Sequence, residues 1–134
     1  MRFLVTGGRS WCGYTPIYRV LKRLYEVDPD AILVHGDCKG ADKIAAQIAR
    51  EMFGRTEAQI EAHPADWTKY KLAAGPIRNQ FMLNESLRRG YVDGHWLKAA
   101  AAFHTHLPSS KGTKHMVKLL EDADVPVLRI SSNL

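Results

Sequence analysis

The sequence predicts an α/β fold built on a parallel sheet. Five short apolar stretches alternate with four segments whose apolar residues recur at helical spacing, which is the pattern of strands joined by helical crossovers. Glycine follows the first two apolar stretches directly, and the connections are short. Because such crossovers are almost always right-handed, we expect a Rossmann-like three-layer sandwich. Its five-stranded parallel sheet would have the order 3-2-1-4-5, with helices on both faces.

The first half of the chain contains two strand–turn–helix units. Residues 2–6 and 31–35 are apolar runs that end at glycine, as buried parallel strands do. Residues 15–27 would form the first helix, with their threonine as N-cap and the following proline in the first turn. Residues 44–52 carry the apolar face of the second helix, which Gly54 closes.

The second half predicts three further strands and two helices. Residues 56–63 alternate polar and apolar side chains, which indicates a half-exposed strand at an edge of the sheet. Residues 75–88 would be a helix opened by a Gly-Pro pair. Residues 97–103 and 125–130 are the last two expected strands, with a helix around residues 116–120 between them.

Composition narrows the class of protein. The 134 residues, 46% of them apolar, predict one domain that spans residues 1–134. The two cysteines, Cys12 and Cys38, form no CxxC motif, so we expect a reduced, cytoplasmic protein. No apolar run approaches the ~18 residues of a membrane span, and residues 1–8 resemble a buried strand more than a signal peptide. The net charge of +5 makes anionic ligands plausible, although the basic residues are scattered.

The turn after the first strand is a candidate ligand loop. Gly7-Gly8-Arg9-Ser10 matches neither the GxGxxG nor the GxxxxGK[ST] fingerprint. Its glycine N–H groups could still approach a ligand closely, with Arg9 or Ser10 adding a side-chain donor. The alternative is a tight turn that needs only the conformational freedom of glycine.

Residues 109–113, Ser-Ser-Lys-Gly-Thr, are the best phosphate candidate in chemical terms. Their hydroxyls, Lys111 and Gly112 stand immediately before a helix, where free N–H groups and the helix dipole attract an anion. The alternative is a plain N-cap by Ser110 or Thr113 beside a solvated lysine.

Two further turns complete the expected site. Arg78 and Asn79 follow the Gly-Pro pair, so we expect them in the first helical turn, where a planar cation beside free N–H groups would hold phosphate. Gly36 begins an acidic turn whose Asp42 or Asp37 would bind ribose hydroxyls. A first-turn helix acid is the alternative for Asp42.

Other side chains offer weaker signals. Trp67 and Tyr70 could stack on a base, although buried packing is the usual role of tryptophan. His104-x-His106 lacks an evident third ligand, so we expect no metal and no prosthetic group. No known catalytic motif is present, and the catalytic residues are unknown. An acid or base would be sought among Glu85, His115 and Asp42.

Four segments together resemble one known family. They are Val5-Thr6-Gly7-Gly8-Arg9-Ser10-Trp11, His35-Gly36-x3-Gly40-Ala41-Asp42, Ala65-Asp66-Trp67 with Ala74-Gly75-Pro76-x-Arg78-Asn79, and Lys111-Gly112-Thr113-x-x-Met116. In this order, and over nearly the whole chain, they resemble the YspA group of the SLOG superfamily. The resemblance implies a Rossmann-like sheet with a pocket for a nucleotide or nucleotide derivative, and it implies that Arg78 binds phosphate.

Relatives in that superfamily differ in activity. They include LOG-type phosphoribohydrolases, which cut the base from a nucleoside monophosphate, a DNA-processing protein that loads recombinase onto single strands, and domains that sense NAD or ADP-ribose. The hydrolases carry a P-G-G-x-G-T motif followed by a catalytic glutamate. Residues 108–113 of this chain read Pro-Ser-Ser-Lys-Gly-Thr and lead into Lys114, His115 and Met116, so the glutamate is not matched.

These observations lead to three functional hypotheses. The first is binding of a phosphate-bearing nucleotide or derivative, of the nucleoside monophosphate, NAD or ADP-ribose type, at the C-terminal ends of the strands. The second is hydrolysis of the N-glycosidic bond of such a ligand. The third is single-stranded DNA binding, which the scattered basic residues favour least. A homo-oligomer is compatible with so small a sheet, and no membrane partner is expected.

Overall fold

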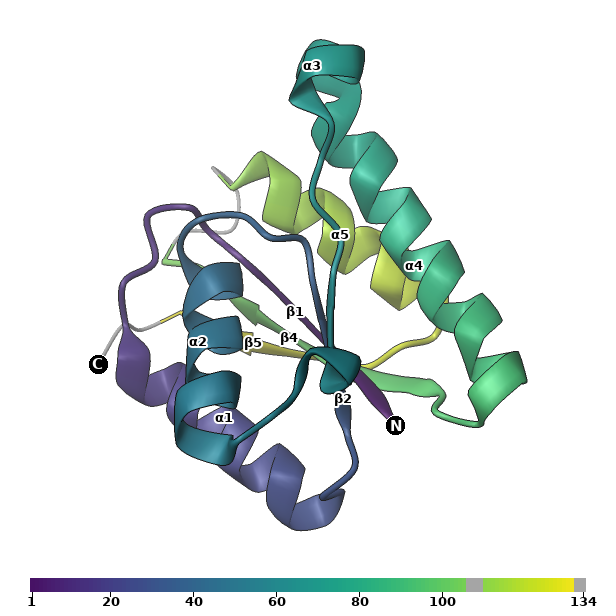
Figure 1. Ribbon diagram of the computed structural model, residues 1–134. Helices are drawn as coiled ribbons and strands as arrows, with labels where there is room; N and C mark the ends of the chain where they lie inside the picture. Colours follow the sequence, from purple (N-terminus) through teal and green to yellow (C-terminus); the bar gives the residue numbers. More distant parts are fainter. Residues whose placement is uncertain (106–109, 132–134) are drawn as a thin grey trace.

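A parallel sheet forms the centre of the protein (Figure 1). The computed structural model describes residues 1–105 and 110–131. The strands are β1 (Arg2–Gly7), β2 (Ile32–His35), β3 (Ile60–Ala62), β4 (Leu97–Phe103) and β5 (Val127–Ile130). They pair in the order β3-β2-β1-β4-β5, and every pair is parallel. The predicted fold class and strand order are confirmed.

Helices cover both faces of this sheet, as expected. The long helices are α1 (Tyr14–Val27), α2 (Ala41–Phe53), α4 (Ala74–Asp93) and α5 (Lys111–Asp122). Figure 1 shows α1 and α2 on one face and α4 and α5 on the other. The short helix α3 (Trp67–Tyr70) stands at the top of that view, and a 3-10 turn, η2 (Lys71–Ala73), joins it to α4.

The central strand β1 contributes to two separate cores. Phe3 and Val5 point to the α1/α2 side, where they join Ile17 in one buried cluster. Leu4 points to the α4/α5 side and joins Met82 in the other. A strand that is buried on both faces has no polar side to show, which is why this segment is a continuous apolar run in the sequence.

The prediction of the third strand is correct for its position and wrong for its length. β3 does lie at an edge of the sheet, as its alternating pattern predicts. However, Glu57–Gln59 form a 3-10 turn, and only Ile60–Ala62 pair with β2. The turn is stabilised by a capping box, in which Gln59 accepts a hydrogen bond from the backbone N–H of Thr56 at 3.0 Å. The sequence contains this T-x-x-Q signature of a helical turn, and the turn forms in place of the first part of the strand that the alternating pattern predicts.

Two helices begin earlier than predicted. Gly13, and not Thr15, occupies the N-cap position of α1. α4 begins at Ala74, directly after the 3-10 turn, and not at the Gly-Pro pair. Arg78 therefore lies in the second turn of α4, one turn beyond the free N–H groups beside which it was expected.

α4 also continues beyond its predicted end. It passes through Gly90, where a Cβ would lie 2.8 Å from the ring of Trp96, so glycine allows that ring to pack against the helix. The helix stops at Gly94, whose φ of 76° is the left-handed conformation typical of a helix C-terminus. α4 is 20 residues long, yet no helix in residues 1–105 and 110–131 combines the length and apolar character of a membrane span.

Candidate functional site

The carboxyl edge of the sheet brings three backbone segments together. The turn after β1 is tied to β4, because the N–H of Gly8 donates to the carbonyl oxygen of Phe103 at 2.9 Å. A Cβ on Gly7 would lie 2.5 Å from the Cβ of Ala41, at the start of α2, and 2.5 Å from the same carbonyl oxygen. Glycine is therefore required here for α2 to pack directly on the end of β1.

The start of α2 also packs on this turn. Gly40, the N-cap of α2, has a φ of 89°. A Cβ on Gly40 would overlap the carbonyl oxygen of Gly8 and lie 2.8 Å from that of Arg9. The turns after β1 and β2, which the sequence predicts as parts of one site, are thus in direct contact.

α5 begins on the open side of the same turn. A Cβ on Gly8 would lie 3.8 Å from the hydroxyl oxygen of Ser110, the N-cap of α5. The Ser110 side chain makes no capping hydrogen bond. The N–H of Lys114 is the first in α5 to find a helical acceptor, at 2.8 Å, so the N–H groups of the three residues before it have none among the described residues. Gly112, one of these three, is exposed and has open space beside its Cα.

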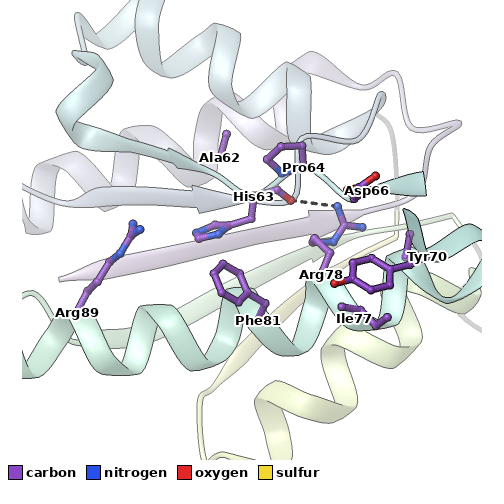
Figure 2. A pocket seen from close by; sticks show the side chains of 10 residues that line it. Ala62, His63, Pro64, Asp66, Tyr70, Ile77, Arg78, Phe81 and Arg89 are labelled. Carbon is purple, nitrogen blue, oxygen red and sulfur yellow. Dashed lines mark hydrogen bonds between the residues drawn. The ribbon is translucent and has the colours of Figure 1, made fainter. Parts of the chain in front are cut away.

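Arg78 joins the ends of two strands. Its Nη1 donates to the carbonyl oxygens of Gly36 and, at 3.4 Å, of His63, which follow β2 and β3 (Figure 2). Its Nη2 donates to the sulfur of Cys38 at 3.5 Å. Since Nη2 carries two hydrogens, one N–H keeps no acceptor within the described part of the chain. Arg78 therefore holds the ends of β2 and β3 together, and one of its N–H groups has no acceptor among the described residues.

Asn79 links α4 to α5. Its side chain is almost fully buried, and its Oδ1 accepts from Nε of Arg78 at 2.8 Å. Its Nδ2 donates to the carbonyl oxygen of Gly112 at 3.3 Å and lies 3.1 Å from Nδ1 of His115. Asn79 therefore sets the position of the first turn of α5 relative to Arg78.

The side chain of Asp42 lies inside the turn after β2 and accepts hydrogen bonds from its backbone. Its side chain is only 5% exposed, and its Oδ2 accepts from the N–H groups of Gly36 at 2.9 Å and Cys38 at 3.4 Å. Oδ1 is buried and has no hydrogen-bond partner among the described residues. Burial raises the pKa of Asp42 to about 7, although these bonds and nearby Arg78 oppose the shift. Asp42 thus lies in the first turn of α2 with its carboxyl group turned inward, and Asp37 is the acid on the open side.

We expect Asp42→Asn to remove a pH dependence of stability. An aspartate whose pKa rises from 3.8 to about 7 on folding contributes stability that is complete below 3.8 and is lost as the pH rises through about 7. The unfolding free energy of the wild type should therefore fall by ~2–4 kcal/mol relative to that of the variant between pH 4 and pH 8. Urea unfolding across this range measures the difference. A constant difference would show that Asp42 titrates normally.

His35 does not disturb that comparison. Burial lowers the pKa of His35 to about 4, so its own contribution to stability is lost as the pH falls through about 4. This change has the opposite sign to that of Asp42. It occurs in wild type and variant alike and cancels in their difference.

A small hollow opens beside these turns. Its volume is about 190 Å³, and it is lined by Arg9, Gly36, Asp37, Cys38, Lys39 and Trp67. The guanidinium carbon of Arg9 lies 5.0 Å from the ring centroid of Trp67, a cation–π distance. The indole is 43% exposed, so it does not take the buried role that is usual for tryptophan. An aromatic face and a cation are therefore presented to solvent at the end of β2.

One comparison with known proteins identifies the family. A family model described as the YspA, cpYpsA-related SLOG family matches residues 1–70, just over half of the chain. The chain belongs to this family. The comparisons with curated proteins and with solved structures found no match. The matched range of this SLOG protein includes the turns after β1 and β2 and Trp67, while Arg78 and α5 lie beyond it.

This SLOG protein has a second, larger hollow between β3 and α4 (Figure 2). Its volume is about 410 Å³, and it is lined by Ala62, His63, Pro64, Asp66, Tyr70, Ala74, Ile77, Arg78, Phe81 and Arg89. The ring of His63 is 7% exposed and contacts Phe81 edge to face, with centroids 6.0 Å apart. Burial lowers the pKa of His63. Arg78 lines this hollow and donates hydrogen bonds to Gly36 and Cys38, which line the smaller one.

Most of the predicted site residues meet at the carboxyl edge. The turns contribute Gly7, Gly8, Arg9, Ser10 and Gly36, and the helices contribute Arg78, Asn79, Ser110, Lys111, Gly112 and Thr113. Thr113 is 4% exposed, so its hydroxyl faces the interior. The sequence analysis missed Cys38 and Lys39, although they occupy the variable positions of Gly36-x3-Gly40. Ser109 and His106 lie outside the described residues.

No catalytic group can be assigned to this edge. Glu85 accepts from Nε of Arg88 at 2.6 Å on the solvent side of α4. His115 contacts Asn79, and Asp42 is buried. Among residues 1–105 and 110–131, no three or more His, Cys, Asp or Glu side chains form a group able to hold a metal ion.

Proposed function

We propose that the carboxyl edge binds a phosphate-bearing nucleotide or nucleotide derivative, of the nucleoside monophosphate, NAD or ADP-ribose type. The observation that carries this proposal is the position of the turn after β1, which lies between the starts of α2 and α5. Helix N-termini attract anions, and parallel α/β sheets bind ligands at this edge. The SLOG resemblance implies the same class of ligand.

The start of α5 is the proposed phosphate position. It offers N–H groups without a helical acceptor, the uncapped hydroxyl of Ser110 and the side chain of Lys111. Arg9 and Lys39 face the neighbouring hollow. Within the described residues, none of these three cations forms an ion pair, so each is available to an anion.

The smaller hollow is the proposed position of the ribose or base. At 190 Å³ it holds one ring system and not a whole nucleotide. The exposed face of Trp67 offers stacking. Asp37, which accepts from Lys43 at 3.0 Å, keeps its second carboxylate oxygen for a hydroxyl group. Asp37 therefore takes the ribose role in place of the buried Asp42.

Lys111→Glu should abolish stabilisation by a nucleotide, and Lys118→Glu should preserve it. Both lysines are exposed on α5, but Lys111 is its first residue, whereas Lys118 lies two turns further on beside Asp122. Thermal unfolding would be followed with AMP, ADP, ATP, NAD, ADP-ribose, and cytidine and guanosine nucleotides. A ligand at 100 times its Kd adds ~2.7 kcal/mol, which raises the melting midpoint by roughly 8 °C or more.

Each outcome of this experiment is informative. A selective rise in the wild type and in Lys118→Glu, absent from Lys111→Glu, supports phosphate binding at α5. An equal rise in all three proteins moves the phosphate elsewhere. No rise with any nucleotide, in a wild type that melts cooperatively, rejects nucleotide binding. Release of free base from the ligand that binds would add the hydrolase activity.

Single-stranded nucleic acid is a second candidate, because α3 presents aromatic rings beside cations. Lys69 lies 5.0 Å from the ring centroid of Tyr70, and Arg9 lies at the same distance from that of Trp67. Both rings are exposed and could stack on successive bases. This function requires an affinity for short DNA strands that rises with strand length and falls steeply with salt.

A further inference from the structure

Arg89 lies at one end of the larger hollow, beside His63 (Figure 2). Its Nη1 is 3.0 Å from Oε2 of Glu61, which forms the ion pair between these two side chains. Glu61 is itself held by Nε and Nη2 of Arg2, at 2.7 and 3.0 Å, and this pair is largely buried. The guanidinium group of Arg89 is therefore fixed in position by an ion pair that belongs to the core.

The edge of Arg89 that consists of Nε and Nη2 has no hydrogen-bond partner among the described residues. Two parallel N–H groups on this edge fit the two oxygens of a carboxylate. Arg2 uses the same edge to bind Glu61. Arg88 uses it to bind Glu85, at 2.6 and 3.3 Å. Both acids thus have an arginine of their own, and the free edge of Arg89 remains available to a carboxylate from outside the chain.

The rest of the larger hollow is mainly apolar. Its walls include Pro64, Ile77 and the rings of Tyr70 and Phe81. Ile77, Tyr70 and Phe81 are exposed to solvent, and exposed apolar side chains around a concave surface are typical of a binding site. The volume of about 410 Å³ lies within the ~300–1,000 Å³ range of small-molecule sites. The hollow therefore has room for a flat ring system beside Arg89.

His63 gives a second, independent indication of a ligand. Its Nε2 is buried and has no hydrogen-bond partner among the described residues, which is rare for a polar atom inside a protein. Burial, and then the charge of Arg89, lower the pKa of His63, so the ring is neutral at pH 7. The exposed ring of Phe81 packs against it. A ligand that moves Phe81 aside would supply the missing partner.

We propose that the larger hollow is a second ligand site, which binds a small carboxylic acid with a flat apolar body, such as an aromatic carboxylate. The carboxylate binds the free edge of Arg89, and the ring packs against Ile77 and Phe81. Two arginines and one aspartate line the hollow, so its charge favours an acid over a neutral molecule or a base. The proposal does not depend on nucleotide binding, because the smaller hollow and the start of α5 consist of other residues.

Calorimetric titration of the full chain with naphthoate at pH 7 tests this inference. Naphthamide has the same ring without the charge and should bind at least about 10-fold more weakly. Arg89→Gln should weaken the binding of naphthoate by about 10- to 100-fold, and the variant should fold because Arg2 still holds Glu61. Arg88→Gln is the matched control and should bind like the wild type, since Glu85 already occupies the corresponding edge of Arg88.

A second pair of variants tests the apolar wall. Ile77→Ala should weaken the binding of naphthoate by about 5-fold, because Ile77 lines the hollow. Val92→Ala should have no effect, since Val92 is an exposed aliphatic residue of the same helix outside the hollow. In amide NMR spectra of the wild type, naphthoate should shift the signals of His63, Phe81 and Arg89.

Four results would overturn the proposal. The first is a wild type that does not bind naphthoate at ~10 mM. The second is equal affinity for naphthoate and naphthamide, and the third is an Arg89→Gln variant that binds naphthoate as tightly as Arg88→Gln does. The fourth is displacement of naphthoate by AMP, which would mean that the acid occupies the proposed nucleotide site. Failure of AMP to bind would reject the nucleotide site and leave this one unaffected.

Discussion

Replacing Arg2 by methionine is expected to lower the free energy of unfolding by about 3–5 kcal/mol. Arg2 is 2% exposed, and all five of its N–H donors are used. Nε and Nη2 bind the carboxylate of Glu61 at 2.7 and 3.0 Å, and Nη1 and Nη2 bind that of Asp93 at 2.9 and 2.7 Å. The fifth bond goes to the carbonyl oxygen of His95 at 2.8 Å. The hydrogen bonds from Arg2 lower the pKa of Asp93 to about 2.

Part of the cost arises from the carboxylates that are left behind, although Glu61 keeps an ion pair with Arg89 at 3.0 Å. Exchanging Glu61→Gln and Asp93→Asn together with Arg2→Met should therefore recover part of the lost stability. Arg129→Met is the control, because Arg129 pairs with Glu121 at 2.8 Å on the surface and such pairs are worth ~0–1 kcal/mol. Urea unfolding measures all three proteins. A loss for Arg2→Met no larger than for Arg129→Met would mean that the network does not stabilise the fold.

The fold could be predicted because its signals are local. Each strand and helix has a buried face, and the spacing of the apolar residues on that face can be recognised within a few adjacent residues. Right-handed crossovers then leave few possible orders for five strands. The same rule sends every β-to-α turn to one edge, so Gly7, Gly36 and Arg78 could be placed near one another without knowledge of any contact.

The contacts of the two key arginines could not be predicted. Arg2 binds carboxylates 59 and 91 residues away, and Arg78 binds a carbonyl oxygen 42 residues away. The acceptors of Arg78 include backbone carbonyl groups, which every residue has, so the residue types do not reveal them. In the sequence, Arg2 is only the polar residue that begins an apolar strand. Arg78 was expected to be free for phosphate because its neighbours, Gly75 and Pro76, looked like the beginning of a helix that in fact starts earlier.

Gly40→Ala should cost about 2–6 kcal/mol of stability, because it combines two penalties. A φ of 89° strains any residue with a Cβ by ~1–3 kcal/mol. The new methyl group also overlaps the carbonyl oxygen of Gly8, and overpacking adds ~1–3 kcal/mol. Gly8 cannot move aside freely, since its carbonyl accepts from the N–H of Trp11 at 3.2 Å and its own N–H is bound to Phe103.

Gly54→Ala separates the two penalties. Gly54 has a φ of 62° but no atom within 4 Å of its Cβ position, so this variant should cost only the ~1–2 kcal/mol of backbone strain. The excess loss in Gly40→Ala then measures how tightly the turns after β1 and β2 are pressed together. Trp11 is buried and packs edge to face on Phe103 at 5.5 Å, so the near-UV circular dichroism should change in Gly40→Ala alone. Equal losses in the two variants would mean that the turn after β1 yields easily and does not fix the position of the start of α2.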